Sequence, residues 1–303
     1  MVMQQFQTVA HDTAAAVSDT LAAGSAHGNG QSGAFDFNEL LHHMKDGREL
    51  ELPGAHVELP ELPTIQVGPL AIDLSITKHV VFLLLAALLL LGLGVTAARS
   101  AKKGLAPRGL RNLLEVIIVF VRDEIAVSNM GPAGLRYLPY LLSTFFLILF
   151  MNLFGLIPYG ASSTSNISVT AGLAVIAFIM IQLAAIKAQG LGHYLAHLTG
   201  GTPWWLWPIM IPIEIIGLFT KPFALCMRLF ANMTGGHIVI LALLGFIFLA
   251  KSLVVAPVSI AFVVGIYFLE LLVAFIQAYI FTMLTALFMG LGMMSAEHAE
   301  EGH

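Results

Sequence analysis

Three charged residues, Glu214, Lys221 and Arg228, follow one another seven apart inside an otherwise apolar stretch. Seven residues make nearly two helical turns, so the three side chains fall along one slowly drifting face of a helix. A charge deep in a membrane segment is costly and points to a function. Arginine does not lose its proton in proteins, so Arg228 would be a fixed positive charge. Glu214 and Lys221 lie nearer the inner end of the stretch.

Small and polar side chains share the predicted face of Arg228. Ala224, Ala231 and Gly235 would let another helix approach closely, and Asn232 could form a hydrogen bond near the guanidinium. This pattern favours an arginine that meets a partner helix. The alternative is an arginine paired with a buried carboxylate for structure alone.

A second apolar stretch carries Glu270 and Gln277, again seven apart. The two stretches are consecutive and should pair antiparallel, so residues at one depth have residue numbers that add to a nearly constant total. Arg228 with Gln277 meets this condition, and so does His237 with Glu270, about 13 Å nearer the outer surface. We therefore predict that His237 and Glu270 meet as a titratable pair. A purely structural hydrogen bond between the helices is the alternative.

The overall composition places these charges in a membrane. Of 303 residues, 58% are hydrophobic and only 11% are charged, whereas soluble domains carry about 25% charge. A soluble globular protein is therefore excluded, and the net charge of −4 leaves no basic excess for nucleic acid. The single cysteine, Cys226, excludes an intramolecular disulfide. His42, His43 and His56 have no ligand pattern around them, so we expect neither a metal site nor a cofactor.

The long apolar stretches predict an all-α integral membrane protein with five transmembrane helices. A spanning helix needs about 20 apolar residues. The last two stretches are too long for an upright crossing, so they must tilt strongly or bend, as an antiparallel hairpin. Pro222 and the Gly235–Gly236 pair are the candidate bend points. The predicted spans cover residues 79–98, 137–157, 168–187, 211–250 and 256–294.

Between the first two spans, residues 108–126 have the pattern of an amphipathic helix that lies in the membrane interface. Four charged residues, Arg108, Arg111, Glu115 and Arg122, fall on one helical face, and the opposite face is apolar. A short soluble helix, or a strand through the VIIVFV run, is the alternative.

The basic residues set the predicted orientation. Seven of the 14 lysines and arginines lie in residues 99–136, which the positive-inside rule places in the cytoplasm. Residues 1–75, with ten acidic and two basic residues, then form an acidic, extracytoplasmic tail without the pattern of a signal peptide. Residues 76–303 form the membrane domain, with its C-terminus inside. Within the tail, the sequence predicts a short helix at 36–47, an extended segment at 51–63 and a small hairpin at 64–75.

Four segments resemble the subunit a family of F-type ATP synthases: KPFALCMRLFANMTGGH (221–237), ELLVAFIQAYIFTMLT (270–285), MNLFGLIPY (151–159) and SNISVT (165–170). The first contains a core similar to that family's signature around its essential arginine. The resemblance covers about residues 76–298. It implies a stator with two aqueous half-channels, through which protons reach and leave a rotating ring of c subunits.

The resemblance also implies roles for individual residues. Arg228 resembles the essential arginine, and His237 with Glu270 resembles the pair of the outer half-channel. Many bacterial members have an acid at the first position of this pair and a histidine at the second; here they are exchanged, as in mitochondrial members. The weaker matches and the polar neighbours are Asn232 and Gln277 beside the arginine, Asn152, Asn166 and Ser168 along the outer channel, and Glu214 and Lys221 as inner-side charges.

The implied partners are the c-subunit ring, a b-subunit peripheral stalk, the rest of the synthase and the lipid membrane. The implied location is a bacterial inner membrane, with the mitochondrial inner membrane as the alternative. The chain shows no nucleotide-binding motif, so we expect a non-catalytic subunit, and His237 and Glu270 favour H⁺ as the ion. A secondary transporter would show two related halves, and an intramembrane hydrolase would need a base beside Cys226. The sequence shows neither.

Overall fold

The computed structural model describes residues 49–52, 55–58, 65–67, 70–72, 77–101, 110–157, 162–192, 194, 204–250 and 255–294. The helix predicted at 36–47 lies outside these residues. Two short antiparallel hairpins precede the helices. β3 (Ile65–Val67) pairs with β4 (Leu70–Ile72) around Gly68–Pro69, which confirms the predicted hairpin. β1 (Glu49–Leu52) pairs with β2 (Ala55–Glu58), so the segment predicted as merely extended is a second hairpin.

Five helices of the described part are long and apolar enough to cross a membrane, as predicted. They are α3 (Lys78–Ala101), α6 (Leu138–Gly155), α7 (Ile167–Gln189), α9 (Trp207–Ala250) and α10 (Val255–Met294). Both ends of each of these five helices lie within a few residues of the prediction. α9 begins at Trp207 rather than at 211 because Pro208 stands in its first turn, where proline is tolerated.

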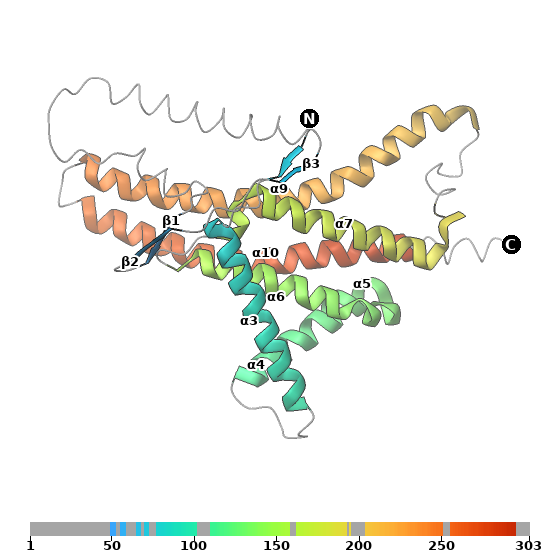
Figure 1. Cartoon of the computed structure of the whole chain (residues 1–303), viewed down its shortest axis with the longest axis horizontal. Coiled ribbons are helices and arrows are strands. Elements are labelled where there is room, and N and C mark those ends of the chain that lie inside the picture. The colour runs from blue at the N-terminus through green and yellow to red at the C-terminus, as the bar shows by residue number, and fades with distance from the viewer. Residues whose placement is uncertain are drawn as a thin grey trace.

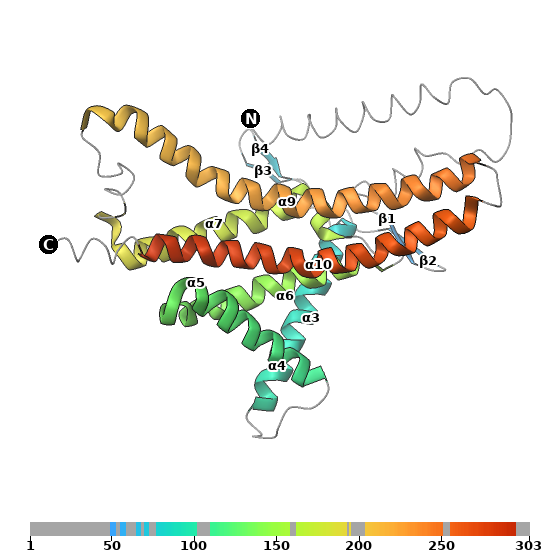
Figure 2. The ribbon, with the colours of Figure 1, turned by 180° about the vertical axis from the view of Figure 1, so that it is seen from behind.

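α9 and α10 run antiparallel against each other and form the long hairpin that the sequence predicts (Figure 1). α6 and α7 also pack on α10, and α7 packs on α9. α3 crosses this bundle at a steep angle and contacts α6 (Figures 1 and 2). α9 bends near its middle in both views (Figures 1 and 2), and Pro222, a predicted bend point, lies inside the helix.

The core lies where α6, α7, α9 and α10 meet. Leu141, Ile148, Leu225, Leu229 and Phe281 are all essentially inaccessible there. Small buried residues on α7 and α10, such as Ala184 and Ala278, let the backbones approach closely.

The predicted amphipathic segment is helical from Leu110 to Met130, so a strand through it is wrong. It consists of α4 (Leu110–Phe120), a π-helical stretch η1 (Val121–Val127) and a short α5 (Ser128–Met130). A 3₁₀ segment, η2 (Gly131–Arg136), connects it to α6. Val121, Ile125 and Ala126 are buried, whereas Arg122 and Asp123 are exposed and ion-paired at 2.7 Å. This pair lowers the pKa of Asp123, chiefly through the hydrogen bonds from Arg122.

Candidate functional site

Arg228 lies on a face of α9 that the rest of the chain leaves open. Its side chain is exposed, and so are Ala224, Ala231, Asn232 and Gly235 around it. Within the described residues, no carboxylate lies at salt-bridge distance from Arg228. Among the described residues, the alternative of an arginine paired with a buried carboxylate for structure alone is therefore not formed. The small neighbours leave room for a helix to pack directly over the guanidinium.

A hydrogen bond joins α9 to α10 near the middle of the hairpin. Asn232 Nδ2 donates to Gln277 Oε1 at 2.7 Å, from α9 to α10. Gln277 is buried, and its Nε2 has no partner within the described chain. Asn232 stands one turn from Arg228, so the predicted level of Arg228 with Gln277 holds to within a turn.

Glu270 is 5% exposed, and neither carboxylate oxygen has a hydrogen-bond partner within the described chain. Its carboxylate lies against the backbone of α9, because a Cβ built on Gly236 would overlap Glu270 Oε1. Gly236 directly precedes His237, so Glu270 lies at the predicted depth, level with His237. The direct hydrogen bond between His237 and Glu270 is not formed, so the bonded structural pair is not the arrangement seen.

A buried histidine that sequence reasoning missed lies close to this level. His79, in the first turn of α3, is 4% exposed. Its Nδ1 lies 3.0 Å from the carbonyl oxygen of Ser162, which can only accept, so Nδ1 carries the proton. His79 and His237 are near enough to interact electrostatically. The available signal is an ionisable residue at the very start of the predicted span 79–98.

His79 belongs to a buried polar cluster, defined here as His79, Asn152, Ser162, Ser163 and Thr164. Thr164 Oγ1 donates to Asn152 Oδ1 at 2.7 Å, and Ser163 Oγ donates to the carbonyl oxygen of His79 at 2.7 Å. The Ser162 and Thr164 hydroxyls lie 2.8 Å apart. Since Thr164 uses its proton on Asn152, Ser162 is the donor. Asn152 Nδ2 is buried and lacks a partner within the described chain.

The cluster forms because α6 ends beside a short 3₁₀ turn, η3 (Ser163–Ser165). A Cβ on Gly155 would overlap Ser162, so glycine is what lets the end of α6 approach this turn. η3 packs against α3, α6, α7 and α9 and therefore joins the four helices.

The other two outer positions predicted from the sequence have local explanations. Asn166 caps α7, with its Oδ1 accepting from the Ser168 backbone N–H at 2.8 Å, and the Ser168 side chain is exposed. An N-cap of this kind fixes where the helix begins.

On the side of Arg228 that faces away from Glu270 and His79 lies a pocket of about 490 Å³. We call it the inner pocket. Arg228, Lys221, Thr220 and Gly217 of α9 line it together with Phe288 of α10, and the remaining lining is aliphatic. The Lys221 ammonium lies 5.1 Å from the centre of the Phe288 ring, a cation–π contact. Two cations thus line one wall of the inner pocket.

Glu214 stands between Ile213 and Gly217, which line the inner pocket, but is not itself part of the lining, and it is half-buried on α9. Its negative charge reaches Tyr194, beyond the end of α7. Burial, and then Glu214, raise the pKa of the Tyr194 hydroxyl. Tyr194 donates to Gln182 Oε1 at 2.5 Å, which ties this end of the chain to α7.

No three histidine, cysteine, aspartate or glutamate side chains of the described residues come close enough together to hold a metal ion. Cys226 is buried, with its sulfur 3.5 Å from the Thr170 hydroxyl. No base contacts it within the described part, and it serves as a packing residue.

Comparison with known proteins matches the whole helical region. A sequence model of the ATP synthase A chain family matches residues 80–290. The chain is 51% identical to ATP synthase subunit a of Chloroherpeton thalassium over 269 residues, which cover 88% of this chain and 79% of that protein. It is 50% identical to ATP synthase subunit a of Myxococcus xanthus over 273 residues, 89% of each chain. ATP synthase subunit a of Chlorobium phaeobacteroides is 51% identical over 279 residues, 91% of this chain and 81% of that protein.

Proposed function

The chain belongs to the ATP synthase A chain family, and from this premise we propose that it is the proton-conducting stator of the membrane sector. In this role it provides two aqueous half-channels and one fixed charge to a rotating ring of c subunits. The observation that carries the proposal is the open face of α9, where Arg228 has no carboxylate partner among the described residues and stands among small side chains.

The outer half-channel is the buried region around Glu270. Buried polar atoms are almost always hydrogen-bonded, and water supplies the missing partners. The atoms without a partner among the described residues are Glu270 Oε1 and Oε2, Asn152 Nδ2, Thr234 Oγ1, Gln277 Nε2 and Gln189 Oε1. All but the last belong to the outer region or to the level of Arg228. Water bound at these atoms would form a wetted path from His79 and His237, past Glu270, to the arginine.

Arg228 separates the two half-channels. It cannot release its proton, so it cannot relay one. An opposite charge stabilises an ionised carboxylate, so a carboxylate of the ring gives up its proton as it approaches Arg228. The released proton leaves by the inner pocket, and a carboxylate that has passed the arginine takes a new proton from the outer side.

The inner half-channel begins in the inner pocket, which Arg228 and Lys221 line. Glu214 marks its far end, where the half-buried carboxylate can hand protons to water. Moving one charge across 100 mV is worth about 2.3 kcal/mol, so several protons are needed for each ATP.

On this proposal the chain itself catalyses no reaction. The ring and a b-subunit stalk are its partners, and ATP chemistry belongs to the rest of the synthase. The relatives are bacterial, which favours a bacterial inner membrane. The seven basic residues within 99–136 support an orientation with the N-terminal tail outside and the C-terminus in the cytoplasm.

The test is proton-driven ATP synthesis by Arg228→Ala in membrane vesicles. We expect assembly of the complex and loss of synthesis, with a higher passive proton leak, because the barrier between the half-channels is gone. Arg228→Lys should also lose most synthesis, since a buried lysine can lose its proton. Arg136→Ala, at an exposed arginine before α6, is the control. Synthesis near the wild-type rate in Arg228→Ala would refute the proposal.

A further inference from the structure

One buried polar atom stands apart from the outer half-channel and from Arg228, at the inner end of α7. It is Gln189 Oε1, which has no partner within the described chain. The Nε2 of the same side chain donates to the carbonyl oxygen of Gly292, near the end of α10. The two helix ends are tightly packed, because a Cβ built on Gly292 would lie 2.9 Å from the Ala185 Cβ. Buried polar atoms are almost always hydrogen-bonded, so we expect a water molecule at Gln189 Oε1.

A second amide shares this face of α7 and fixes a tyrosine. Gln182 precedes Gln189 by seven residues, nearly two turns. Its Oε1 accepts from the Tyr194 hydroxyl at 2.5 Å. Tyr194 can reach back to α7 because the chain turns at Gly190, whose φ of +76° is a conformation that other residues rarely adopt. The Tyr194 backbone N–H then donates to the Gly190 carbonyl oxygen at 3.1 Å, which closes a further helical turn.

The Tyr194 oxygen is an acceptor close to a second acceptor. Since its proton is used on Gln182, this oxygen can only accept a further hydrogen bond. The carboxylate of Glu214 is near enough to act on it electrostatically. Among the described residues, no cation lies at salt-bridge distance from Glu214. Two acceptors cannot bond to each other, but a water molecule between them can donate to both.

We propose that Tyr194 is a positioning residue of the inner half-channel, whose hydroxyl orients the water that exchanges protons with Glu214. A protonated Glu214 carboxyl gives its proton to this water, so a carboxylate and a hydronium ion form, and pumping in the opposite direction reverses the step. Tyr194 keeps its own proton on the bond to Gln182 throughout. The inference rests on the proposed function and states where the inner half-channel ends: at the end of α7, on the side of Gln189.

Few other charges can act on this water. Lys221 is seven residues farther along α9, and its ammonium lies 5.1 Å from the centre of the Phe288 ring. Lys187 is exposed near the end of α7, and the charged residue of α10 is Glu270, in the outer half. The acidic residues of η1 stand on an element that packs on α6 and α10. Among the described residues of α7, α9 and α10, Glu214 is therefore the group at this end whose charge follows the inner pH.

The experiment is ATP-driven proton pumping by the assembled synthase, in vesicles with the inner side facing the medium. Protons then reach Glu214 from a medium whose pH can be varied. Tyr194→Phe keeps the ring and removes the hydroxyl, so we expect pumping to fall about threefold, as for one weak hydrogen bond. The loss should be larger in alkaline than in acid medium, because protons are then scarce. Tyr137→Phe, at a half-buried tyrosine just before α6, is the matched control and should pump as the wild type at each pH.

Two further variants test whether the hydroxyl acts through Glu214. In Glu214→Gln no carboxyl exchanges protons, so adding Tyr194→Phe should cause no further loss. Gln182→Met leaves the Tyr194 hydroxyl in place but removes its acceptor, and should cost about twofold, with the same dependence on inner pH. Should Tyr194→Phe fail to assemble, Gln182→Met, alone and combined with Glu214→Gln, decides in its place.

Two outcomes overturn the proposal. A loss that is equal at every inner pH and adds to that of Glu214→Gln would make Tyr194 a structural tie to α7. Wild-type pumping in both Tyr194→Phe and Gln182→Met would mean that the inner half-channel ends elsewhere. In either case Arg228→Ala still loses synthesis if the chain is the stator, so the failure of this inference is distinguishable from the failure of the proposed function.

Discussion

On the outer side of Arg228, α6 and η3 pack on the hairpin and α3 packs on α6 and η3, and polar groups are buried there: Glu270, Asn152 and His79. On the other side, the inner pocket opens beside Arg228 and is lined mainly by aliphatic residues with Lys221. A titratable carboxylate is thus enclosed on one side, and a fixed cation faces open space on the other. The contrast suggests that the outer side controls the delivery of protons and that the inner side needs only to let them leave.

The largest effect should come from the enclosed carboxylate. Glu270→Gln keeps the shape and removes the titration, so we expect ATP-driven proton pumping to fall by roughly 10²-fold, as for loss of a general acid or base. Glu214→Gln, on the inner side, should cost much less, and Glu115→Gln, exposed on α4, should cost nothing. Equal losses of pumping in the Glu270 and Glu214 variants would contradict the view that the outer side controls proton delivery and the inner side does not.

The second test displaces the same carboxylate without removing it. In Gly236→Ala the new Cβ overlaps Glu270 Oε1, so the carboxylate must move. We expect pumping to fall about tenfold, less than the 10²-fold that a misplacement of about 1 Å can cost. Gly265→Ala, in the same half of the hairpin with nothing within 4 Å of its Cβ, is the matched control. Wild-type pumping in Gly236→Ala would mean that the position of Glu270 is not critical.

A substitution at His79 tests whether α3, which packs over the outer side, contributes to proton transport. His79→Asn removes the imidazole and its bond to the Ser162 carbonyl oxygen. A hydrogen bond between membrane helices is worth about 0.6 kcal/mol, so we expect pumping to fall by at least threefold. Thermal unfolding of the purified complex, measured in parallel, separates a transport defect from a folding defect. A variant that is less stable but pumps normally would make His79 purely structural.

The smallest effect should come from the inner pocket. Lys221→Met keeps an apolar contact with Phe288 but removes the cation–π contact, worth about 0.5–1 kcal/mol. We expect a slight loss of stability and pumping within about twofold of the wild type. A large loss, comparable to that of Glu270→Gln, would show that the inner pocket also needs its second cation.

The sequence predicts what depends on one helix or on two consecutive ones. The five spans follow from apolar length, and the register of α9 against α10 follows from residue numbers, as Asn232 with Gln277 and Gly236 with Glu270 bear out. The open face of Arg228 is also predictable, because small residues recur on that side.

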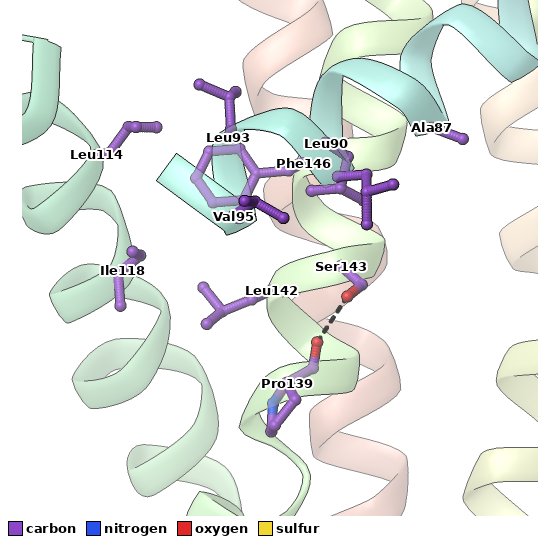
Figure 3. Close-up of a pocket in the computed structure, with 12 residues that line it drawn as sticks. Ala87, Leu90, Leu93, Val95, Leu114, Ile118, Pro139, Leu142, Ser143 and Phe146 are labelled. Atoms are coloured by element: carbon purple, nitrogen blue, oxygen red, sulfur yellow. Dashed lines mark hydrogen bonds between the residues drawn. The ribbon is translucent and has the colours of Figure 1, made fainter. Parts of the chain in front are cut away.

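Contacts between distant segments could not be predicted. The bond of His79 to Ser162 joins residues 83 apart, and it depends on how α3 crosses α6, which no periodicity encodes. One predicted contact is not formed: His237 and Glu270 lie at a similar depth but are not hydrogen-bonded. Adding residue numbers gives the depth of each residue, but it does not give the direction in which each side chain points around its helix axis. A groove between α3, α4 and α6 (Figure 3) likewise depends on contacts between distant segments, which the sequence does not predict.

The bond between Asn232 and Gln277 has a mechanical meaning as well. α9 has 44 residues and is about 66 Å long, and a ring that turned past its open face would push it sideways near Arg228. Two smooth apolar helices can slide past each other, since dispersion contacts are easily exchanged for equivalent ones. A directional bond one turn from the point of force resists such shear and passes the torque to α10, which is anchored on α6 and α7. Stiffness of the stator against rotation would then depend in part on this amide pair at the middle of the hairpin, beside the packing of α7 and η3 on α9.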